Sequence, residues 1–99
     1  MNFVEYQAEA SQTAHYPRRM SNLEYPTLGL AGEAGEVANI VKKISRDFAG
    51  EITDEIRGKL KDELGDVLWY ISACADELGL TLDEIAAFNV EKLSRRHGR

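Results

Sequence analysis

Apolar residues recur at intervals of three and four along almost the whole of this 99-residue chain, and only Pro17 and Pro26 interrupt the pattern. Such spacing places apolar side chains on one face of a helix, and no segment has the strict alternation that is typical of a strand. We therefore predict an all-α fold of four helices, with the second and third helices the longest.

Local signals place the ends of these helices. Ser21 with Glu24 and Thr81 with Glu84 have capping-box spacing and predict the starts of the second and fourth helices. Gly79 predicts the end of the third. The predicted helices run from residue 3 to 14, from the Ser21 cap to 48, from a cap at Thr53 or Asp54 to 78, and from Thr81 into the tail.

The length and composition of the chain fit one small domain. With 43% hydrophobic and 29% charged residues, the composition is that of an ordinary globular protein, so we expect a single domain over residues 1–99. A domain this short buries a small fraction of its surface, and self-association of an apolar helix face adds stability. We therefore expect a homodimer or a homotetramer.

The net charge and the cysteine content limit which classes of partner and which cellular compartment we expect. A net charge of −5 argues against binding to nucleic acid polymers, and the basic "SRRHGR" at the end is more simply a solvated tail than a phosphate contact. Cys74 is the only cysteine, which fits a reducing compartment. The sequence has neither a signal-peptide pattern nor an apolar run long enough for a membrane span. We expect a cytoplasmic protein with no membrane partner.

Two matched pairs of carboxylates lie on the second and third predicted helices. Glu33 and Glu36 occur in "GLAGEAGEV", and Glu63 and Asp66 occur in "DELGDVLWY". At about 100° per residue, the first acid of each pair lies beside an apolar line and the second about 60° further out. Because helices joined by a short turn pack antiparallel, we expect the four carboxylates to converge.

Four converging carboxylates need a counter-charge. Like charges in a partly desolvated site repel strongly and favour proton uptake, and a divalent cation removes that repulsion. A ligand set made only of oxygen suits Mg²⁺ or Mn²⁺, and Mg²⁺ commonly shares its coordination with substrate phosphates. The simpler alternative is that the acids are solvated and paired with lysines such as Lys59 and Lys43.

The segments "LGLAGEAGEVANIVKK" and "ELGDVLWYI" resemble the MazG-like branch of the all-α nucleotide pyrophosphohydrolases, whose signature is E-x-x-E, a spacer, and E-x-x-D. The resemblance implies Mg²⁺-dependent hydrolysis of a nucleoside or deoxynucleoside triphosphate between the α and β phosphates, by a helical dimer or tetramer. It also implies metal ligation by Glu33, Glu36, Glu63 and Asp66, and phosphate contacts from Lys59, Asn89, Lys92 and Arg96, with Arg95 as an alternative to Arg96.

The remaining roles are less tightly constrained by the sequence. Glu33 and Glu36 are the candidates for a catalytic general base. Tyr70 and Tyr16 are the candidates for contact with the base of the nucleotide, whereas we expect Trp69 in a core or subunit interface. Two other classes of function stay open: a noncatalytic helical module that binds nucleotides or partner proteins, and a simple helical dimerisation module.

Overall fold

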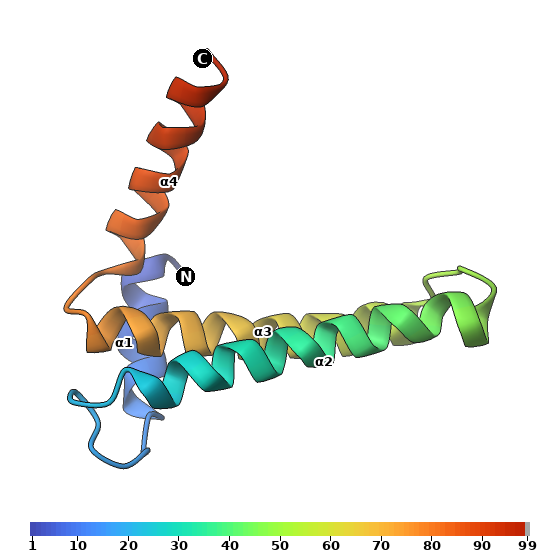
Figure 1. The fold of residues 1–99 in the computed structure, drawn as a ribbon, viewed down its shortest axis with the longest axis horizontal. Helices are drawn as coiled ribbons and strands as arrows, with labels where there is room; N and C mark the ends of the chain where they lie inside the picture. Colours follow the sequence, from blue (N-terminus) through green and yellow to red (C-terminus); the bar gives the residue numbers. More distant parts are fainter. Residues whose placement is uncertain (99) are drawn as a thin grey trace. The chain divides into compact units, whose positions relative to one another are not determined.

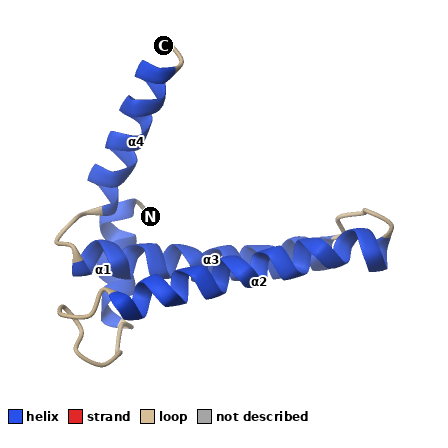
Figure 2. Cartoon of the chain, in the orientation of Figure 1, coloured by secondary structure: helices blue, strands red, loops and turns tan. Residues whose placement is uncertain are grey.

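The computed structural model describes residues 1–98, which form four α-helices and no strand. The helices are α1 (Phe3–Gln12), α2 (Glu24–Phe48), α3 (Asp54–Glu77) and α4 (Leu82–Arg96) (Figures 1 and 2). The predicted all-α fold of four helices, with the second and third the longest, is confirmed.

The chain divides into two compact units. The hairpin unit is Glu24–Ile71, and the terminal unit combines Met1–Leu23 with Ser72–Arg99. Helix α3 begins in the hairpin unit and ends in the terminal unit.

In the hairpin unit, α2 and the greater part of α3 lie side by side and run in opposite directions (Figure 1). A short turn reverses the chain, with Ala49 and Gly50 at φ values of 52° and 80°. The hydroxyl of Thr53 accepts a hydrogen bond of 3.2 Å from the backbone N–H of Ile56, so the predicted cap at the start of α3 is confirmed. Ile56 and Ile44 are both buried, and they form part of the small core of this unit.

At Gly29 the ring of Tyr70 from α3 packs against the backbone of α2. A Cβ atom added at this position would lie 2.1 Å from Cε1 of Tyr70 and 2.5 Å from two further atoms of the same ring. By contrast, Gly32 and Gly35 on the same helix have open space where a Cβ would lie. The first glycine of the "GLAGEAGEV" segment therefore admits an aromatic ring from α3, and the other two have no packing neighbour of this kind.

The two sides of the hairpin differ in chemistry. Val41 and Leu64 are 50% and 54% exposed. Val41 lies about 80° around α2 from Glu33, and Leu64 lies about 100° around α3 from Glu63. Glu36 and Asp66 lie about 60° around their helices in the other direction, and both are exposed. The acids therefore occupy one side of the hairpin, and exposed aliphatic side chains occupy the opposite side.

In the terminal unit, the side chain of Gln7 joins α1 to the connection between α3 and α4. Its Nε2 donates to Oδ1 of Asp76 at 2.8 Å and to the carbonyl of Leu80 at 3.0 Å. Its Oε1 accepts from the backbone N–H of Leu82 at 2.8 Å, at the first residue of α4. Both N–H donors and the carbonyl oxygen of one amide thus hold three elements together.

The start of α4 agrees with the sequence prediction. Thr81 and Glu84 form the reciprocal capping box, in which each side chain accepts from the other residue's backbone N–H. Gly79, predicted to end α3, follows the last residue of that helix and has a φ of 67°. Both local signals were sufficient here because the groups that satisfy them lie within a few residues.

The segment before α2 differs from the prediction. Helix α1 ends at Gln12 rather than at residue 14, and α2 begins at Glu24, so Ser21 does not occupy its N-cap position. The reason is a distant residue: the carboxylate of Glu77 accepts from the hydroxyl of Tyr16 and, at 2.8 Å each, from the backbone N–H groups of Met20 and Asn22. These contacts hold the segment as an ordered loop.

Candidate metal site

Three carboxylates converge on the polar side of the hairpin. Glu33 of α2 and Glu63 and Asp66 of α3 each offer one oxygen, and these oxygens all lie within 4.8 Å of one another. Glu33 and Glu63 are half-buried, and Asp66 is exposed. The antiparallel packing produces this arrangement, because residues at corresponding turns of the two helices meet across the groove.

The electrostatics of the cluster centre on Glu63. Its pKa is raised to about 7, first because its carboxyl group shares a hydrogen bond with that of Glu33, then because of burial, and finally because of repulsion from neighbouring acids. Its Oε2 atom is enclosed, and no N–H or hydroxyl donor among residues 1–98 reaches it. A buried carboxylate oxygen without a donor is well suited to accept a cation.

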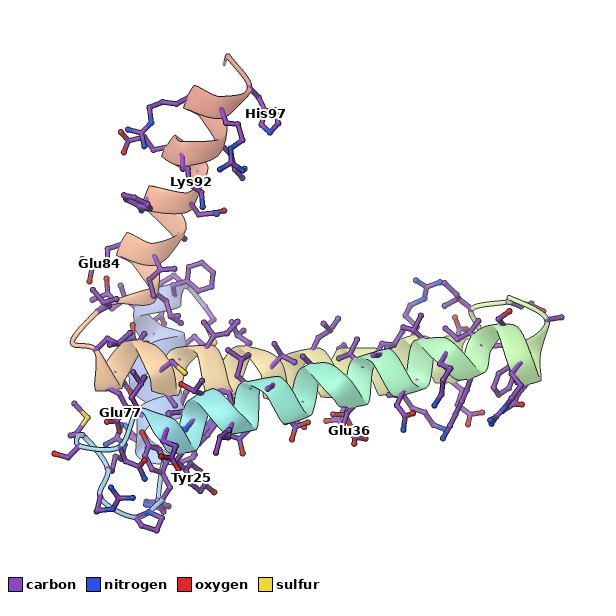
Figure 3. The ribbon with its side chains drawn as sticks, viewed as in Figure 1. Tyr25, Glu36, Glu77, Glu84, Lys92 and His97 are labelled. Atoms are coloured by element: carbon purple, nitrogen blue, oxygen red, sulfur yellow. The ribbon has the colours of Figure 1, made fainter. Side chains whose placement is uncertain are left out.

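Glu36, the fourth predicted ligand, lies outside this group of three. It is exposed and follows Glu33 by one helical turn, on the same side of α2 as Tyr25 (Figure 3). The structure therefore brings together three of the four predicted carboxylates.

The predicted phosphate-contacting residues fall in different parts of the chain. Lys59 lies on α3, one turn before Glu63, and its Nζ is 3.6 Å from Oε1 of Glu55, with both side chains mostly exposed. Asn89, Lys92 and Arg96 lie exposed on α4, in the terminal unit. Spaced by three and four residues, these three share one face of α4.

The two predicted base-contacting tyrosines have different surroundings. Tyr70 belongs to the hairpin unit, where burial raises its pKa first and electrostatic interactions with Tyr25, Glu33 and Asp66 raise it further. Tyr16 is buried in the terminal unit and donates its hydroxyl to Glu77, which together with burial raises its pKa to about 12. Trp69 is half-buried and makes an edge-on contact with Tyr70, with ring centroids 5.0 Å apart and an interplanar angle of 84°.

The donor set of the cluster fits a hard divalent cation. It consists of carboxylate oxygens alone, with no histidine or cysteine in the group. A cation would compensate the mutual repulsion that raises the pKa of Glu63. The arrangement is therefore compatible with a divalent cation.

The sequence over residues 22–99 matches the family described as MazG nucleotide pyrophosphohydrolase domain. The chain belongs to this family. The match includes both carboxylate pairs, so the resemblance identified from the sequence is confirmed. Membership indicates nucleotide pyrophosphohydrolase chemistry in general, and divalent metals are generally used in the MazG family.

Two relatives extend the comparison. The chain is 48% identical over 99 aligned positions to the Gene 37 protein of Mycobacterium phage L5, covering 95% of this chain and 87% of the phage protein. It is 36% identical over 72 residues to the uncharacterized protein YvdC of Bacillus subtilis strain 168, covering 68% of each chain. No solved structure gives a significant match. Among the residues described, no helix of this MazG-family chain is long and apolar enough to cross a membrane.

Tyr25 interacts with Tyr70 on the hairpin, and the sequence prediction gave it no role. It lies in the first turn of α2, four residues before Gly29 and eight before Glu33, and it is 44% exposed. The signal that would have found it is this four-residue spacing, which continues the line of the first acid toward the start of the helix.

Proposed function

We propose that this chain is a Mg²⁺-dependent nucleoside triphosphate pyrophosphohydrolase that converts an NTP or dNTP to the monophosphate and pyrophosphate. The observation that carries the proposal is the convergence of Glu33, Glu63 and Asp66 within 4.8 Å, in a chain of the MazG family. Mn²⁺ is the alternative ion. We assign the activity to one domain over residues 1–99, acting on the cytoplasmic nucleotide pool.

The carboxylates have distinct roles in this proposal. Glu33, Glu63 and Asp66 hold the cation, and Glu36 completes the ligand set when substrate is present. A cation held by these carboxylates would neutralise the charge of the triphosphate and would activate a water for attack. Glu33 and Glu36 are the candidates to accept the proton of the water that attacks the α phosphorus, and the bond to pyrophosphate then breaks.

The cationic residues stabilise the charge that accumulates on the leaving pyrophosphate. Lys59 is exposed one turn from Glu63, and its only described ion pair, at 3.6 Å to Glu55, is solvent-exposed and therefore weak. Asn89, Lys92 and Arg96 would contribute further phosphate contacts from α4. Tyr70 is the proposed contact to the base. Tyr16 was the other residue that we expected to contact the base, but its hydroxyl donates a hydrogen bond to Glu77.

We further propose that the active form is a homodimer or homotetramer. Two helices alone enclose a small core, and the hairpin carries exposed aliphatic side chains such as Val41 and Leu64 on the side away from the acids. Burial of this side against a second copy would create a four-helix arrangement and leave the acidic side accessible. The cluster and the apolar side would then be used by different partners.

Pyrophosphate release from a panel of NTPs and dNTPs, with Mg²⁺ or Mn²⁺, tests the proposal. Glu63→Gln removes a charge at the centre of the cluster with little change in size, and Glu51→Gln, in the exposed turn between α2 and α3, is the matched control. We expect release by the wild type and by the control, and its loss in Glu63→Gln. Nucleotide binding without release would favour the noncatalytic nucleotide-binding module, and the absence of both would leave a helical interaction module.

A further inference from the structure

The side chains along the polar side of the hairpin follow a fixed order. Starting from the beginning of α2, Tyr25 comes first, then the contact of Tyr70 with Gly29, then the cluster of carboxylates, and finally Lys59. Tyr25 and Glu33 are eight residues apart, which corresponds to about 12 Å along the helix. The cluster therefore has aromatic side chains on one side and a cation on the other.

This order has consequences for any ligand that carries a phosphate chain and a planar ring. The phosphates of a triphosphate bound at the cluster gain from extending toward Lys59, where a positive charge is available. A nucleobase gains from extending in the other direction, because aromatic rings stack on every base. The reverse orientation would place the base beside an ammonium group and the phosphates beside phenols.

The two tyrosines are not equivalent as stacking surfaces. One part of the Tyr70 ring is held against the backbone of α2 at Gly29, and Trp69 makes an edge-on contact with the ring as well. Tyr25 is 44% exposed at the start of α2 and lies close enough to Tyr70 to interact with it electrostatically. Tyr25 thus offers the more accessible ring at the aromatic end of the groove.

We propose that Tyr25 contacts the nucleoside of the substrate, which lies along the hairpin with its base toward Tyr25 and Tyr70 and its pyrophosphate toward Lys59. This inference rests on the proposed function. It assigns base recognition to the first turn of α2, with Tyr70 held in place by its contact at Gly29. The recognised class is a nucleoside 5′-phosphate, and ring stacking by Tyr25 tolerates purines and pyrimidines alike.

The test compares three ligands in the presence of Mg²⁺: a nucleoside triphosphate, the corresponding monophosphate, and inorganic tripolyphosphate, which has no base. Affinities are measured by calorimetry for the wild type, Tyr25→Ala, Tyr25→Phe and Lys59→Ala. Leu28→Ala, which truncates a 64% exposed side chain on the neighbouring turn of α2, is the matched control. The Mg²⁺-dependent rise in melting temperature checks that each variant retains the folded cluster.

We expect Tyr25→Ala and Lys59→Ala to weaken the binding of different pairs of ligands. Tyr25→Ala should weaken the binding of both nucleotides roughly 5- to 150-fold, the range for loss of one stacking contact, and leave tripolyphosphate unchanged. Lys59→Ala should weaken the triphosphate and tripolyphosphate but leave the monophosphate nearly unchanged. Tyr25→Phe and Leu28→Ala should behave as the wild type.

The outcomes separate this inference from the proposed function. If the wild type binds and hydrolyses nucleotides but Tyr25→Ala retains full affinity, or weakens tripolyphosphate equally, the assignment of Tyr25 is wrong and the proposed function stands. If Lys59→Ala weakens the monophosphate and the triphosphate equally, the proposed direction of the substrate is wrong. If the wild type binds none of the three ligands, the proposed function itself fails.

Discussion

The contact between Gly29 and Tyr70 allows a sharp prediction about stability. In Gly29→Ala the new methyl group would lie 2.1 Å from Cε1 of Tyr70, whereas ordinary contact begins near 3.4 Å, so the ring must withdraw by more than an ångström. Forcing an extra methyl group into a packed site costs about 1–3 kcal/mol. Alanine gains about 1 kcal/mol over glycine in a helix, so we expect Gly29→Ala to be neutral or destabilising by up to about 2 kcal/mol.

Gly32→Ala is the matched control because it makes the same substitution on the same helix. No atom lies within 4 Å of the position that its Cβ would take, so only the gain in helix propensity of about 1 kcal/mol remains. The propensity gain is common to both variants, and the difference between them therefore measures the cost of displacing the ring. We expect a difference in the free energy of unfolding of about 1–3 kcal/mol, with Gly29→Ala the less stable.

Chemical denaturation at one fixed protein concentration, with metal removed, measures both free energies of unfolding. The same pair is then made in a Tyr70→Ala background, where the ring is absent and both glycine substitutions should stabilise equally. Equal effects of Gly29→Ala and Gly32→Ala in the wild-type background would refute the proposed close packing. A difference that persists without the Tyr70 ring would show that another group causes it.

Three further predictions follow from other parts of the structure. The pKa of Glu63 is raised to about 7, so the folded protein keeps a proton that the unfolded chain releases near the ordinary pKa of a glutamic acid. Without metal, the stabilisation due to Glu63 is therefore present at acidic pH and is lost as the pH rises through about 7. Stabilisation by Mg²⁺ should grow over the same pH range. Melting curves with EDTA or Mg²⁺ measure this, and a Glu63→Gln variant with the same pH profile would contradict it. Tyr16→Phe removes a donor to the Glu77 carboxylate and should lower the free energy of unfolding by about 1.5–3 kcal/mol. It should not change the order of preference among nucleobases, and an altered order in steady-state assays would indicate that Tyr16 contacts the base. Leu64→Glu places a charge on the apolar side of the hairpin and should reduce the molar mass found by sedimentation, whereas Leu28→Glu should leave it unchanged; oligomers of the same size in both variants would exclude this side as the interface.

Most of the fold could be predicted because its signals are local. Apolar spacing locates the helices, and the caps at Thr53 and Thr81 satisfy backbone groups within three residues. The loop before α2 could not be predicted, because Glu77 determines its structure from 55 positions away in sequence at Asn22. Ser21 is a residue type that favours N-caps, but a local pattern does not reveal a distant carboxylate that binds the neighbouring N–H groups of Met20 and Asn22.

For the candidate site, the sequence predicts which face of each helix a residue lies on, but not which side chains come together. By angle alone, Glu36 and Asp66 are equivalent second acids, yet only Asp66 joins Glu33 and Glu63 within 4.8 Å. Glu36 keeps its carboxylate in water, where hydration stabilises the charge better than a place beside three other acids would. The sequence prediction chose Tyr16 as a base contact and gave Tyr25 no role, and it could not reveal that the hydroxyl of Tyr16 donates to Glu77.

The two sides of the hairpin affect its stability in different ways. On the polar side, repulsion among Glu33, Glu63 and Asp66 opposes folding, and proton uptake by Glu63 relieves it only at lower pH. On the other side, exposed aliphatic residues stabilise the hairpin only when something covers them. Under the proposed function, metal and a second copy of the chain each bind the folded hairpin on a different side, so their stabilising effects should add. In this proposal, self-association on the apolar side would stabilise the hairpin before the metal binds.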